Sequence, residues 1–342
     1  MKRFRSHRSR RTRRGTALRF GILLAVLLVV LVGGYGIGRY LEENEYKQER
    51  QQMSENFGLL PTREYGGQTY VLRPEVETVL LLGVDQHMDE EVKGYQRGGQ
   101  ADFLLLLALD HKNRTIHQLQ IDRDTMTEIT VYSLLGDVKR DRVAQICLAH
   151  GFGGTNEERC KNAVKAVEKL LDGISIDLYM AIKLDGIAAL NQALDGITVT
   201  LPEDYSHLDP VMVKGTTLKL NDKQAELLVR SRMTVGDGTN ASRMMRQRTF
   251  LTAAANQLLV KLREDSEFGG KLFDALDQIS SYMNFNRGRM INEINRAYNY
   301  DILPAEVLAG EYNIGENGYM EFHPDKDAVS EWIITNLYEP KK

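Results

Sequence analysis

Two uninterrupted apolar runs, TVLLLGVD at 78–85 and ADFLLLLALD at 101–110, lie close together in the chain. Neither run alternates with polar residues, which is typical of central strands that are buried on both faces of a sheet. A third segment, TIHQLQID at 115–122, alternates and follows the second run after the polar turn DHKN. That turn predicts antiparallel pairing of the second and third strands. Together the three segments predict a buried sheet with helices packed against it.

Helix and strand signals alternate along the rest of the chain, which favours an α/β fold with a central mixed β-sheet flanked by helices. Helices are expected at 156–172, 223–231 and 242–262, with a short one from Asp185 to Leu194, and strands at 176–184 and 196–201. The expected N-caps are Thr155 (in a capping box with Glu158), Asp185, Asp222, and one of Thr239, Asn240 or Ser242. The segment 123–154 has no regular pattern, and 270–335 is expected to be mainly helical with one break at GEYNIGENGYMEF, residues 310–322.

The N-terminus has a different character. Residues 1–19 hold nine Lys or Arg and no acid, and residues 20–38, FGILLAVLLVVLVGGYGIG, carry no charge. At about 1.5 Å per residue the uncharged run spans roughly 28 Å, close to the thickness of the bilayer's hydrocarbon core. The run predicts a single retained transmembrane helix. A cleaved signal peptide is the alternative, although the run is long for one and no A-x-A site follows.

The positive-inside rule then predicts that residues 1–19 stay in the cytoplasm and that the remainder lies outside the cell membrane. We expect a stalk at 39–75, an α/β domain at 76–262, and a helical C-terminal part at 263–342 packed on the same domain. The chain has 44 basic and 47 acidic residues, so the part beyond the basic tail is acidic, with 35 basic residues against 47 acidic ones. An acidic exported domain argues against nucleic acid as a partner.

Three charged residues mark the ends of the predicted strands. Asp85 ends the first strand, Asp102 begins the second and Arg123 follows the third. In an up, down, up arrangement all three lie at one edge of the sheet. Two neighbouring carboxylates repel unless a cation lies between them, and carboxylate oxygens are ligands that Mg²⁺ prefers. A magnesium site is one interpretation; strand-end carboxylates that pair with Arg123 are the other.

A second cluster of charge lies between Leu228 and Arg248. It contains Arg230, Arg232, Arg243, Arg246 and Arg248, with Asp237 as its one acid. On the helix at 242–262, Arg243, Arg246 and Gln247 are expected to project to one side near the helix start, where free N–H groups favour an anion. Arg248 is expected to point elsewhere, into solvent. The alternatives are a phosphate-binding cluster and an ordinary helix surface paired with nearby acids.

A dication and several guanidinium groups around a phosphate-rich ligand would support phosphoryl transfer, which needs mainly positioning and charge neutralisation. No serine, cysteine or histidine nucleophile arrangement competes with this interpretation, and the GxxxxGK[ST] and HExxH motifs are absent from the sequence. The two cysteines, Cys147 and Cys160, are either a disulfide or two buried thiols.

Several segments, in order and in approximate spacing, resemble the LytR-CpsA-Psr (LCP) family: LLLGVD, QADFLLLLALD, IDRDT, GISIDLYMAIKLDGIAALNQALDGITVTL and VRSR…SRMMRQR. The resemblance covers about residues 78–262, together with the basic N-terminus and single membrane helix. It implies an LCP-type phosphotransferase that binds a polyprenyl-pyrophosphate-linked glycan outside the lipid bilayer. Such a protein transfers the glycan phosphate to peptidoglycan and has pyrophosphatase activity as a further possible reaction.

The same resemblance implies roles for individual residues. Asp85 and Asp102 match the metal-binding aspartates, with Mg²⁺ or Mn²⁺ as the cofactor, and Arg123 matches the arginine of a PRD motif. Asp85, Asp102 and Arg123 are the expected catalytic residues. The expected pyrophosphate-binding residues are Arg123, Arg230, Arg232, Arg243 and Gln247, to which the charge pattern adds Arg246. The apolar runs fit the walls of a tunnel for the isoprenoid chain.

The chain also departs from the family pattern. Gln100 stands where an arginine is frequent, Asp122 replaces the proline of PRD, and Asn240 stands where an aspartate is expected. A KIN-like segment reads QIC, with Gln145 and Cys147 in place of lysine and asparagine. These departures keep a second hypothesis open, in which the protein is a non-catalytic polyprenyl-phosphate-binding scaffold or regulator of the cell wall.

Overall fold

The computed structural model describes residues 60–86, 94–183, 185–265, 267–297 and 299–341. The predicted cytoplasmic tail at 1–19, the transmembrane helix at 20–38 and the stalk up to residue 59 lie outside these residues. Within the described part of the chain, none of the helices is long and apolar enough to cross a bilayer.

A six-stranded sheet forms the centre of the domain, in the order β11-β8-β3-β4-β5-β12. Its strands are β3 (Val76–Val84), β4 (Ala101–Asp110), β5 (Thr115–Ile121), β8 (Leu178–Lys183), β11 (Ser280–Met283) and β12 (Asp301–Glu306). The pairs β3–β8 and β5–β12 are parallel, and the other neighbours are antiparallel. The predicted mixed α/β sheet is confirmed, and its first three strands form the expected meander.

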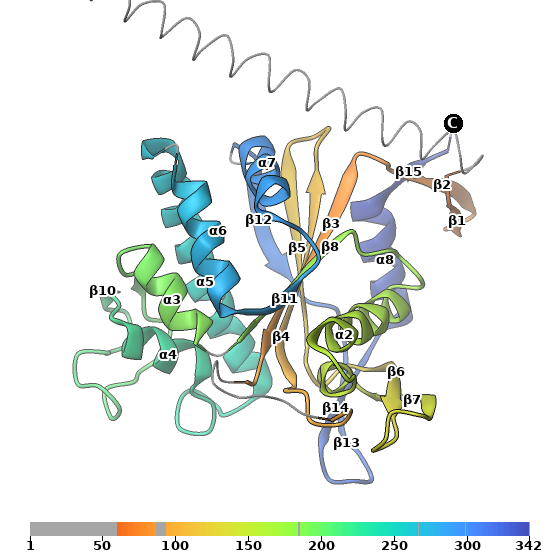
Figure 1. Ribbon diagram of the computed structural model, residues 1–342, viewed down its shortest axis with the longest axis horizontal. Helices are drawn as coiled ribbons and strands as arrows, with labels where there is room; N and C mark the ends of the chain where they lie inside the picture. The colour runs from red at the N-terminus through yellow and green to blue at the C-terminus, as the bar shows by residue number, and fades with distance from the viewer. Residues whose placement is uncertain (1–59, 87–93, 184, 266, 298, 342) are drawn as a thin grey trace, which may run out of the picture. The chain divides into compact units, whose positions relative to one another are not determined.

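The apolar runs pack on both faces of this sheet. Leu80, Leu106 and Leu119 lie opposite one another in the register and are fully buried. Figure 1 shows α2 (Asn156–Leu170) and α8 (Lys326–Leu337) to one side of the sheet and the remaining helices to the other. The latter are α3 (Gly186–Ala193), α4 (Asp222–Arg230), α5 (Asn240–Glu264), α6 (Phe268–Ile279) and α7 (Arg287–Ala297). Each group of helices encloses its own apolar core.

Thr155 and Thr239 are N-caps as expected, and two other helix starts differ. The Thr155 side chain accepts a hydrogen bond from the Glu158 N–H at the start of α2, and Thr239 caps α5 in the same way. The Glu158 carboxylate accepts from the Gly154 N–H and not from Thr155, so only half of the expected capping box is present. For α4 the cap is Asn221, one residue before the expected Asp222, because Asn221 and Gln224 satisfy each other's backbone N–H groups. Asp185 makes no side-chain cap bond to α3.

Among the short strands outside the main sheet, β9 (Thr198–Thr200) lies within the strand expected at 196–201, whereas the others were not expected from the sequence. β6 (Met126–Tyr132) and β7 (Lys139–Gln145) form a hairpin in the segment that has no regular pattern, followed by the 3-10 helix η1 (Ile146–Gly151). The first five residues of β7 are exposed, so it lacks the apolar signal of a buried strand. β9 (Thr198–Thr200) pairs with β10 (Thr217–Lys219).

The compact unit begins earlier than residue 76. β1 (Thr62–Tyr65) and β2 (Gln68–Leu72) form a hairpin through Gly66 and Gly67, whose φ values of 58° and 79° suit glycine. The C-terminal strand β15 (Tyr338–Pro340) adds to the other edge of β2. Residues 62–342 form one compact unit, so the C-terminal part belongs to the same body as the sheet.

The expectation of a mainly helical 270–335 is only partly correct. Strands β11 and β12 from this region occupy the two edges of the main sheet. The expected break at 310–322 contains β13 (Gly310–Ile314), which pairs with β14 (Met320–Pro324). Edge strands need only one hydrogen-bonding partner, and β12 is largely exposed, so neither shows the long apolar run of β3 or β4.

Candidate functional site

One edge of the central sheet carries the charged residues that end the first strands. Asp85 directly follows β3, Asp102 is the second residue of β4, and Arg123 lies just beyond β5. The Arg123 guanidinium forms an ion pair with Asp102 Oδ1. The structure therefore places these three residues at one rim, as the meander predicts.

Arg123 is held from several sides. Besides Asp102 it donates to Gln100 Oε1, its Nη2 lies 3.4 Å from the Cys147 thiol, and its Nε lies 3.5 Å from Asp124 Oδ1. Burial raises the pKa of the Cys147 thiol to about 11, so the sulfur stays protonated near neutral pH. The guanidinium is thus fixed by a set of neutral and anionic partners at the rim.

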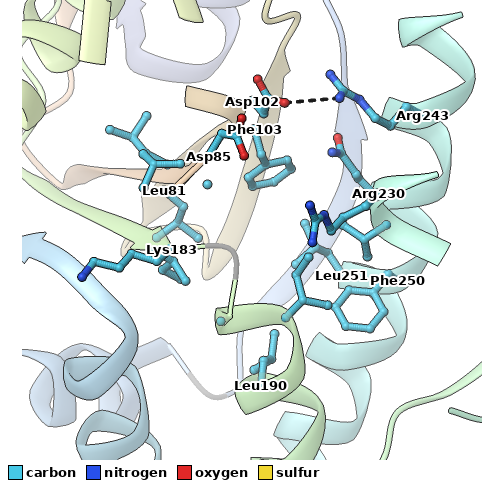
Figure 2. Close-up of a pocket in the computed structure, with 18 residues that line it drawn as sticks. Leu81, Asp85, Asp102, Phe103, Lys183, Leu190, Arg230, Arg243, Phe250 and Leu251 are labelled. Carbon is cyan, nitrogen blue, oxygen red and sulfur yellow. Dashed lines mark hydrogen bonds and ion pairs between the residues drawn. The ribbon is translucent and has the colours of Figure 1, made fainter. Parts of the chain in front are cut away.

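Helix α5 brings a second guanidinium to the same carboxylate. Arg243 Nη1 lies 3.4 Å from Asp102 Oδ2 (Figure 2). Arg243 Nη2 donates to Asn240 Oδ1 at 2.7 Å. Burial lowers the pKa of Arg243, and the nearby Arg123 and Arg232 lower it further, although Asp102 acts in the opposite direction. Neighbouring cations repel one another, and an anionic ligand would relieve that repulsion.

The other residues of the arginine cluster separate into two groups. Arg230 is the last residue of α4, is exposed, and lines the cavity described below together with the buried Gln247. Arg232 is close enough to Asp124 and Arg243 to affect the pKa of each. Arg230, Arg232, Arg243 and Gln247 thus come together around the rim.

Arg246 does not join that group, contrary to the expectation that it projects with Arg243 and Gln247. Its side chain is fully buried, forms an ion pair with Glu203, and donates to Ser242 Oγ at 2.7 Å and to the Ser231 carbonyl. Although Arg246 lies between Arg243 and Gln247 in the sequence, its side chain leaves the helix in a different direction, toward the loop that carries Glu203. Arg246 therefore ties α5 to that loop and to the end of α4.

Arg248 also differs from the prediction of a solvated side chain. It is half-buried and donates to Gln120 Oε1 at 2.7 Å, and burial lowers its pKa. Gln120 in turn donates to Gln247 Oε1 at 3.0 Å. These bonds join α5 to the neighbouring strand β5.

An apolar cavity of about 330 Å³, here called the first cavity, opens beside this rim (Figure 2). Its polar lining residues are Asp85, Asp102, Lys183, Arg230, Arg243 and Gln247. Its apolar lining comes from β3 and β4 (Leu81, Leu82, Gly83, Val84, Phe103), from Ile182, Gly186, Ile187 and Leu190, and from Val229, Phe250 and Leu251. The site is therefore an apolar cavity with charged groups gathered at one end.

Lys183 is a lining residue that the sequence reasoning missed. It is the last residue of β8, and it pairs in register with Val84, next to Asp85. The signal was a lysine at the end of the apolar strand LYMAIK, at the same sheet edge as the two aspartates.

Four of the five departures from the family pattern fall into two contacting sets, and the fifth, Gln145, donates to Asp124 Oδ1 at 3.1 Å. Gln100 and Cys147 meet at Arg123, with the Cys147 sulfur 4.0 Å from Gln100 Oε1. Asp122 and Asn240 meet separately, because Asn240 Nδ2 donates to Asp122 Oδ1 at 2.8 Å. Asp122 is buried and its other oxygen accepts from the Tyr312 hydroxyl at 2.6 Å, so this extra acid faces away from the rim.

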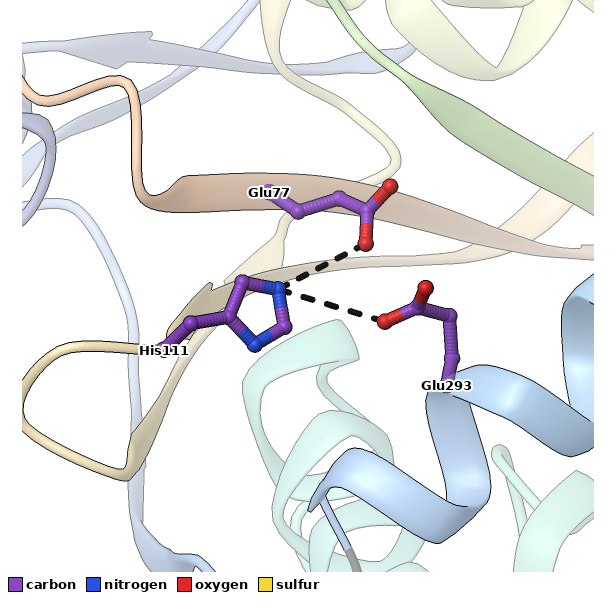
Figure 3. A group of neighbouring side chains, drawn as sticks. All are labelled: Glu77, His111 and Glu293. Atoms are coloured by element: carbon purple, nitrogen blue, oxygen red, sulfur yellow. Dashed lines mark ion pairs between the residues drawn. The ribbon is translucent and has the colours of Figure 1, made fainter. Parts of the chain in front are cut away.

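A separate group at the far end of β3 could hold a metal ion. Glu77, His111 and Glu293 have ligand atoms that all lie within 4.8 Å of one another (Figure 3). His111 Nε2 lies 3.6 Å from Glu77 and 3.9 Å from Glu293. Arg289 pairs with both carboxylates and Arg296 with Glu293. Since these two arginines already balance the two carboxylates, a dication here would leave a net positive charge in a buried place.

The two cysteines are not bonded to each other. Cys147 lies in η1 beside Arg123, Cys160 lies in α2, and both are buried free thiols. The disulfide alternative is therefore wrong. Burial raises the pKa of Cys160 to about 12, as expected for an inert thiol.

This fold and site define a class. The sequence profile of the LytR-CpsA-Psr (LytR_cpsA_psr) family matches residues 40–332. The chain belongs to the LytR-CpsA-Psr family.

Named relatives add detail. The chain is 29% identical over 235 residues to the polyisoprenyl-teichoic acid–peptidoglycan teichoic acid transferase TagU of Bacillus cereus (strain AH820), covering 66% of each chain. It is 24% identical over 331 residues to the transferase TagV of Bacillus subtilis (strain 168), covering 93% of this chain and 75% of TagV. It is also 25% identical over 274 residues to biofilm regulatory protein A of Streptococcus mutans, covering 76% of this chain and 59% of that protein.

Solved structures agree with the fold. Bacillus subtilis TagV matches with a TM-score of 0.56 at 23% identity, covering 77% of this chain and 96% of that one. A structure of TagT bound to LI-WTA matches with a TM-score of 0.57 at 21% identity, covering 77% and 91%. The chain spans 66% of the length of TagU and 59% of the length of the biofilm regulatory protein.

Proposed function

We propose that this protein transfers the phosphate-linked glycan of a polyprenyl-pyrophosphate carrier to peptidoglycan. The observation that carries this proposal is the first cavity, whose apolar lining leads to a rim of two aspartates and several guanidinium groups. Such a cavity suits a ligand with a long hydrocarbon tail and an anionic head. The relatives named as teichoic acid transferases, TagU and TagV, support the same activity.

The hydrocarbon tail fits the apolar lining. Leu81, Phe103, Leu190 and Leu251 come from both strands and helices and leave a space of about 330 Å³ between the sheet and α5. Removing methylene groups from water contributes about 0.8 kcal/mol for each one buried. An isoprenoid chain in this space would therefore anchor the carrier without any polar contact.

The diphosphate fits the rim. Arg230, Arg232 and Arg243 provide guanidinium groups that match phosphate oxygens, and Gln247 provides an amide beside them. Arg123 adds charge from the opposite side of Asp102.

Asp85 and Asp102 have the donor chemistry for Mg²⁺, because hard carboxylate oxygens with phosphate and water complete the shell that this ion prefers. Asp85 is exposed at the cavity, and its carboxylate makes no hydrogen bond or ion pair with the side chain of another described residue, so it can take a ligand. A bound Mg²⁺ would neutralise charge on the diphosphate.

In the reaction, a hydroxyl oxygen of the acceptor attacks the phosphorus next to the glycan. A new P–O bond forms to the acceptor, and the P–O bond to the second phosphate breaks. The products are glycan-phosphate-acceptor and polyprenyl monophosphate, and the hydroxyl proton leaves to solvent or base. Water in place of the acceptor gives pyrophosphate hydrolysis. Arg123 and Arg243 stabilise the charge on the transferring and leaving oxygens.

On this proposal the reaction takes place outside the cell membrane. The uncharged run at 20–38 would anchor the chain, and the nine basic residues before it would remain in the cytoplasm. This location places the described domain on the side of the membrane where peptidoglycan lies.

Release of polyprenyl phosphate from a polyprenyl-pyrophosphate disaccharide tests the proposal, with the full-length protein in detergent and with Mg²⁺ or EDTA. Asp102→Asn should lower turnover by about a hundredfold or more, because it weakens charge stabilisation at the rim. Asp327→Asn, at an exposed position in the first turn of α8, is the matched control and should retain activity. Equal turnover of wild type and Asp102→Asn, at equal melting temperatures, would rule out the proposed site.

A second candidate function is a non-catalytic binder or regulator. The observation in its favour is that Gln100 and Cys147 both engage Arg123, the residue expected to meet the transferring phosphate. The biofilm regulatory protein among the relatives fits this reading. Tight binding of the lipid carrier with no product released from it, in Mg²⁺ and with peptidoglycan fragments present, would favour the regulator.

A further inference from the structure

A second cavity, of about 360 Å³, lies on the other side of the first turns of α5. Its polar lining residues are Gln120, Asp122, Thr125, Arg248 and Tyr312. The rest comes from Ile121, from Ala241 and Met244 of α5, from the segment 307–310, and from Phe322. Because Asp122 directly follows β5, this cavity borders the same edge of the sheet as Arg123.

One layer of hydrogen-bonded side chains separates the two cavities. Gln120 lines the second cavity and donates to Gln247, which lines the first. Nearer the rim, Asn240 accepts from Arg243 at 2.7 Å and donates to Asp122 at 2.8 Å. A group bound in the second cavity would therefore lie next to whatever Arg243 holds.

The chemistry of the lining disfavours two ligand classes. Among the described residues, Arg248 is the one basic residue of the lining, and the Asp122 carboxylate lies in the same lining, so a diphosphate would meet repulsion as well as attraction. A hydrocarbon chain would bury Arg248 and Gln120 against apolar groups, at a cost of desolvation.

A saccharide fits the same lining. The rings of Tyr312 and Phe322 are 4.8 Å apart and offer an apolar surface for the C–H face of a sugar. Arg248, held in place by its bond to Gln120, offers its remaining N–H groups to hydroxyl and amide oxygens. The Thr125 hydroxyl is fully buried in the lining and has no hydrogen-bond partner among the described residues. Buried polar groups usually have partners, so an unpaired hydroxyl in a cavity wall indicates a place for a ligand atom.

We propose that the second cavity is the acceptor site and binds a segment of N-acetylated glycan strand. This inference rests on the proposed transferase function, since the cavity borders the sheet edge that carries Arg123 and lies beside the layer that holds Arg243. The apolar side of the cavity, with Met244 and Leu308, accommodates the N-acetyl methyl group, and the polar side holds the ring hydroxyls.

Calorimetric titration of the full-length protein in detergent with chitotetraose, a chain of four N-acetylglucosamine units, tests the inference. Wild type should bind it. Ala241→Trp places a large ring at an exposed position of the cavity lining and should weaken binding by about tenfold or more. Thr252→Trp, also exposed on α5 but in the lining of neither cavity, is the matched control and should bind as wild type does.

A second variant and a second ligand keep the outcomes separate. Arg248→Gln should also weaken chitotetraose binding, while farnesyl diphosphate should bind Ala241→Trp and wild type equally, because it uses the first cavity. Failure of wild type to bind farnesyl diphosphate would contradict the proposed function. The chitotetraose titration would still test whether the second cavity binds a glycan strand. Absence of chitotetraose binding to wild type, or equal binding to Ala241→Trp, would overturn the inference, as would binding of a free stem peptide alone.

Discussion

Asn240 donates a hydrogen bond of 2.8 Å to Asp122, and both residues are buried departures from the family pattern. An acid is expected near the start of α5 and a proline after β5, yet here the acid follows β5 and an amide starts α5. The contact joins the end of β5 to the start of α5. The two departures thus pair with each other, and Arg243 keeps its contact with the Asn240 side-chain oxygen Oδ1.

The Asp122–Asn240 contact should show strong coupling in urea unfolding. Asp122→Ala leaves the Asn240 amide and the Tyr312 hydroxyl unpaired and should lower the free energy of unfolding by about 1–3 kcal/mol. Asn240→Asp places two carboxylates together and should also destabilise the protein. The double variant Asp122→Asn with Asn240→Asp exchanges the two groups and should recover most of the loss. If the changes in unfolding free energy of the two single variants simply add up in the double variant, the two side chains do not stabilise each other and the prediction is wrong.

Substitution of Arg246 should mainly lower the stability of the protein, whereas substitution of Arg243 should mainly weaken ligand binding. Arg246→Ala leaves Glu203 without its buried cation and should cost about 3–5 kcal/mol of unfolding free energy. Arg243→Ala, one helical turn earlier, should cost much less, because Asp102 keeps its ion pair with Arg123. Binding of farnesyl diphosphate should instead fall in Arg243→Ala. Thermal melts and titrations of both variants make the comparison, and an equal stability loss would show that Arg243 is also structural.

Filling the apolar part of the first cavity should discriminate between ligands by tail length. Leu251→Trp occupies space beside Phe250 and should weaken binding of a long prenyl diphosphate far more than of isopentenyl diphosphate. Each methylene kept in water costs about 0.8 kcal/mol, so the difference should exceed a hundredfold in the dissociation constant, or about 2.7 kcal/mol. The exposed Asn256→Trp on the same helix is the control. Equal weakening of both ligands would place the tail elsewhere.

His150 should make stability depend on pH. It is fully buried, it lies 2.8 Å from the Gly99 carbonyl oxygen, and burial lowers its pKa from 6.5 to about 4. The unfolded chain therefore takes up a proton below pH 6.5 that the folded chain accepts only near pH 4, so stability falls as pH falls through this window. The loss is up to about 3 kcal/mol.

The control for that effect is His150→Asn, whose amide can keep the bond to Gly99 but cannot titrate. Unfolding free energies of wild type and variant, measured from pH 7 to pH 4, should diverge progressively as pH falls. Parallel curves would mean that His150 is protonated in the folded protein or accessible to water.

The centre of the fold could be predicted because its signals are local. The runs around Leu80 and Leu106 have one reading, a strand buried on both faces, and the short turn after Asp110 determines their direction relative to β5. Those directions then bring Asp85, Asp102 and Arg123 to one rim. The edge strands could not be predicted, because their exposed faces carry no apolar pattern.

The roles within the arginine cluster depend on partners that are distant in the sequence. Helical spacing places Arg243 and Gln247 one turn apart on the same side, and both reach the first cavity. The same spacing cannot reveal that Glu203 draws Arg246 away or that Gln120 holds Arg248. The Glu77, His111 and Glu293 group is a stronger case, because residues from three separate elements meet only after folding.

Strand β15 has a mechanical consequence. Its residues Tyr338 and Pro340 lie opposite Leu72 and Tyr70 of β2. Strand β15 is therefore hydrogen-bonded to the β1–β2 hairpin, where the compact unit begins. Arg73 reinforces that junction through Asp110 and the Asn336 carbonyl. A force that pulls on residue 62 would act first on the hydrogen bonds of the β1-β2-β15 sheet. The strands that carry Asp85 and Asp102 would not bear that force directly. Deleting residues 338–342 should therefore weaken the attachment of the β1–β2 hairpin, while the positions of Asp85 and Asp102 at the rim stay the same.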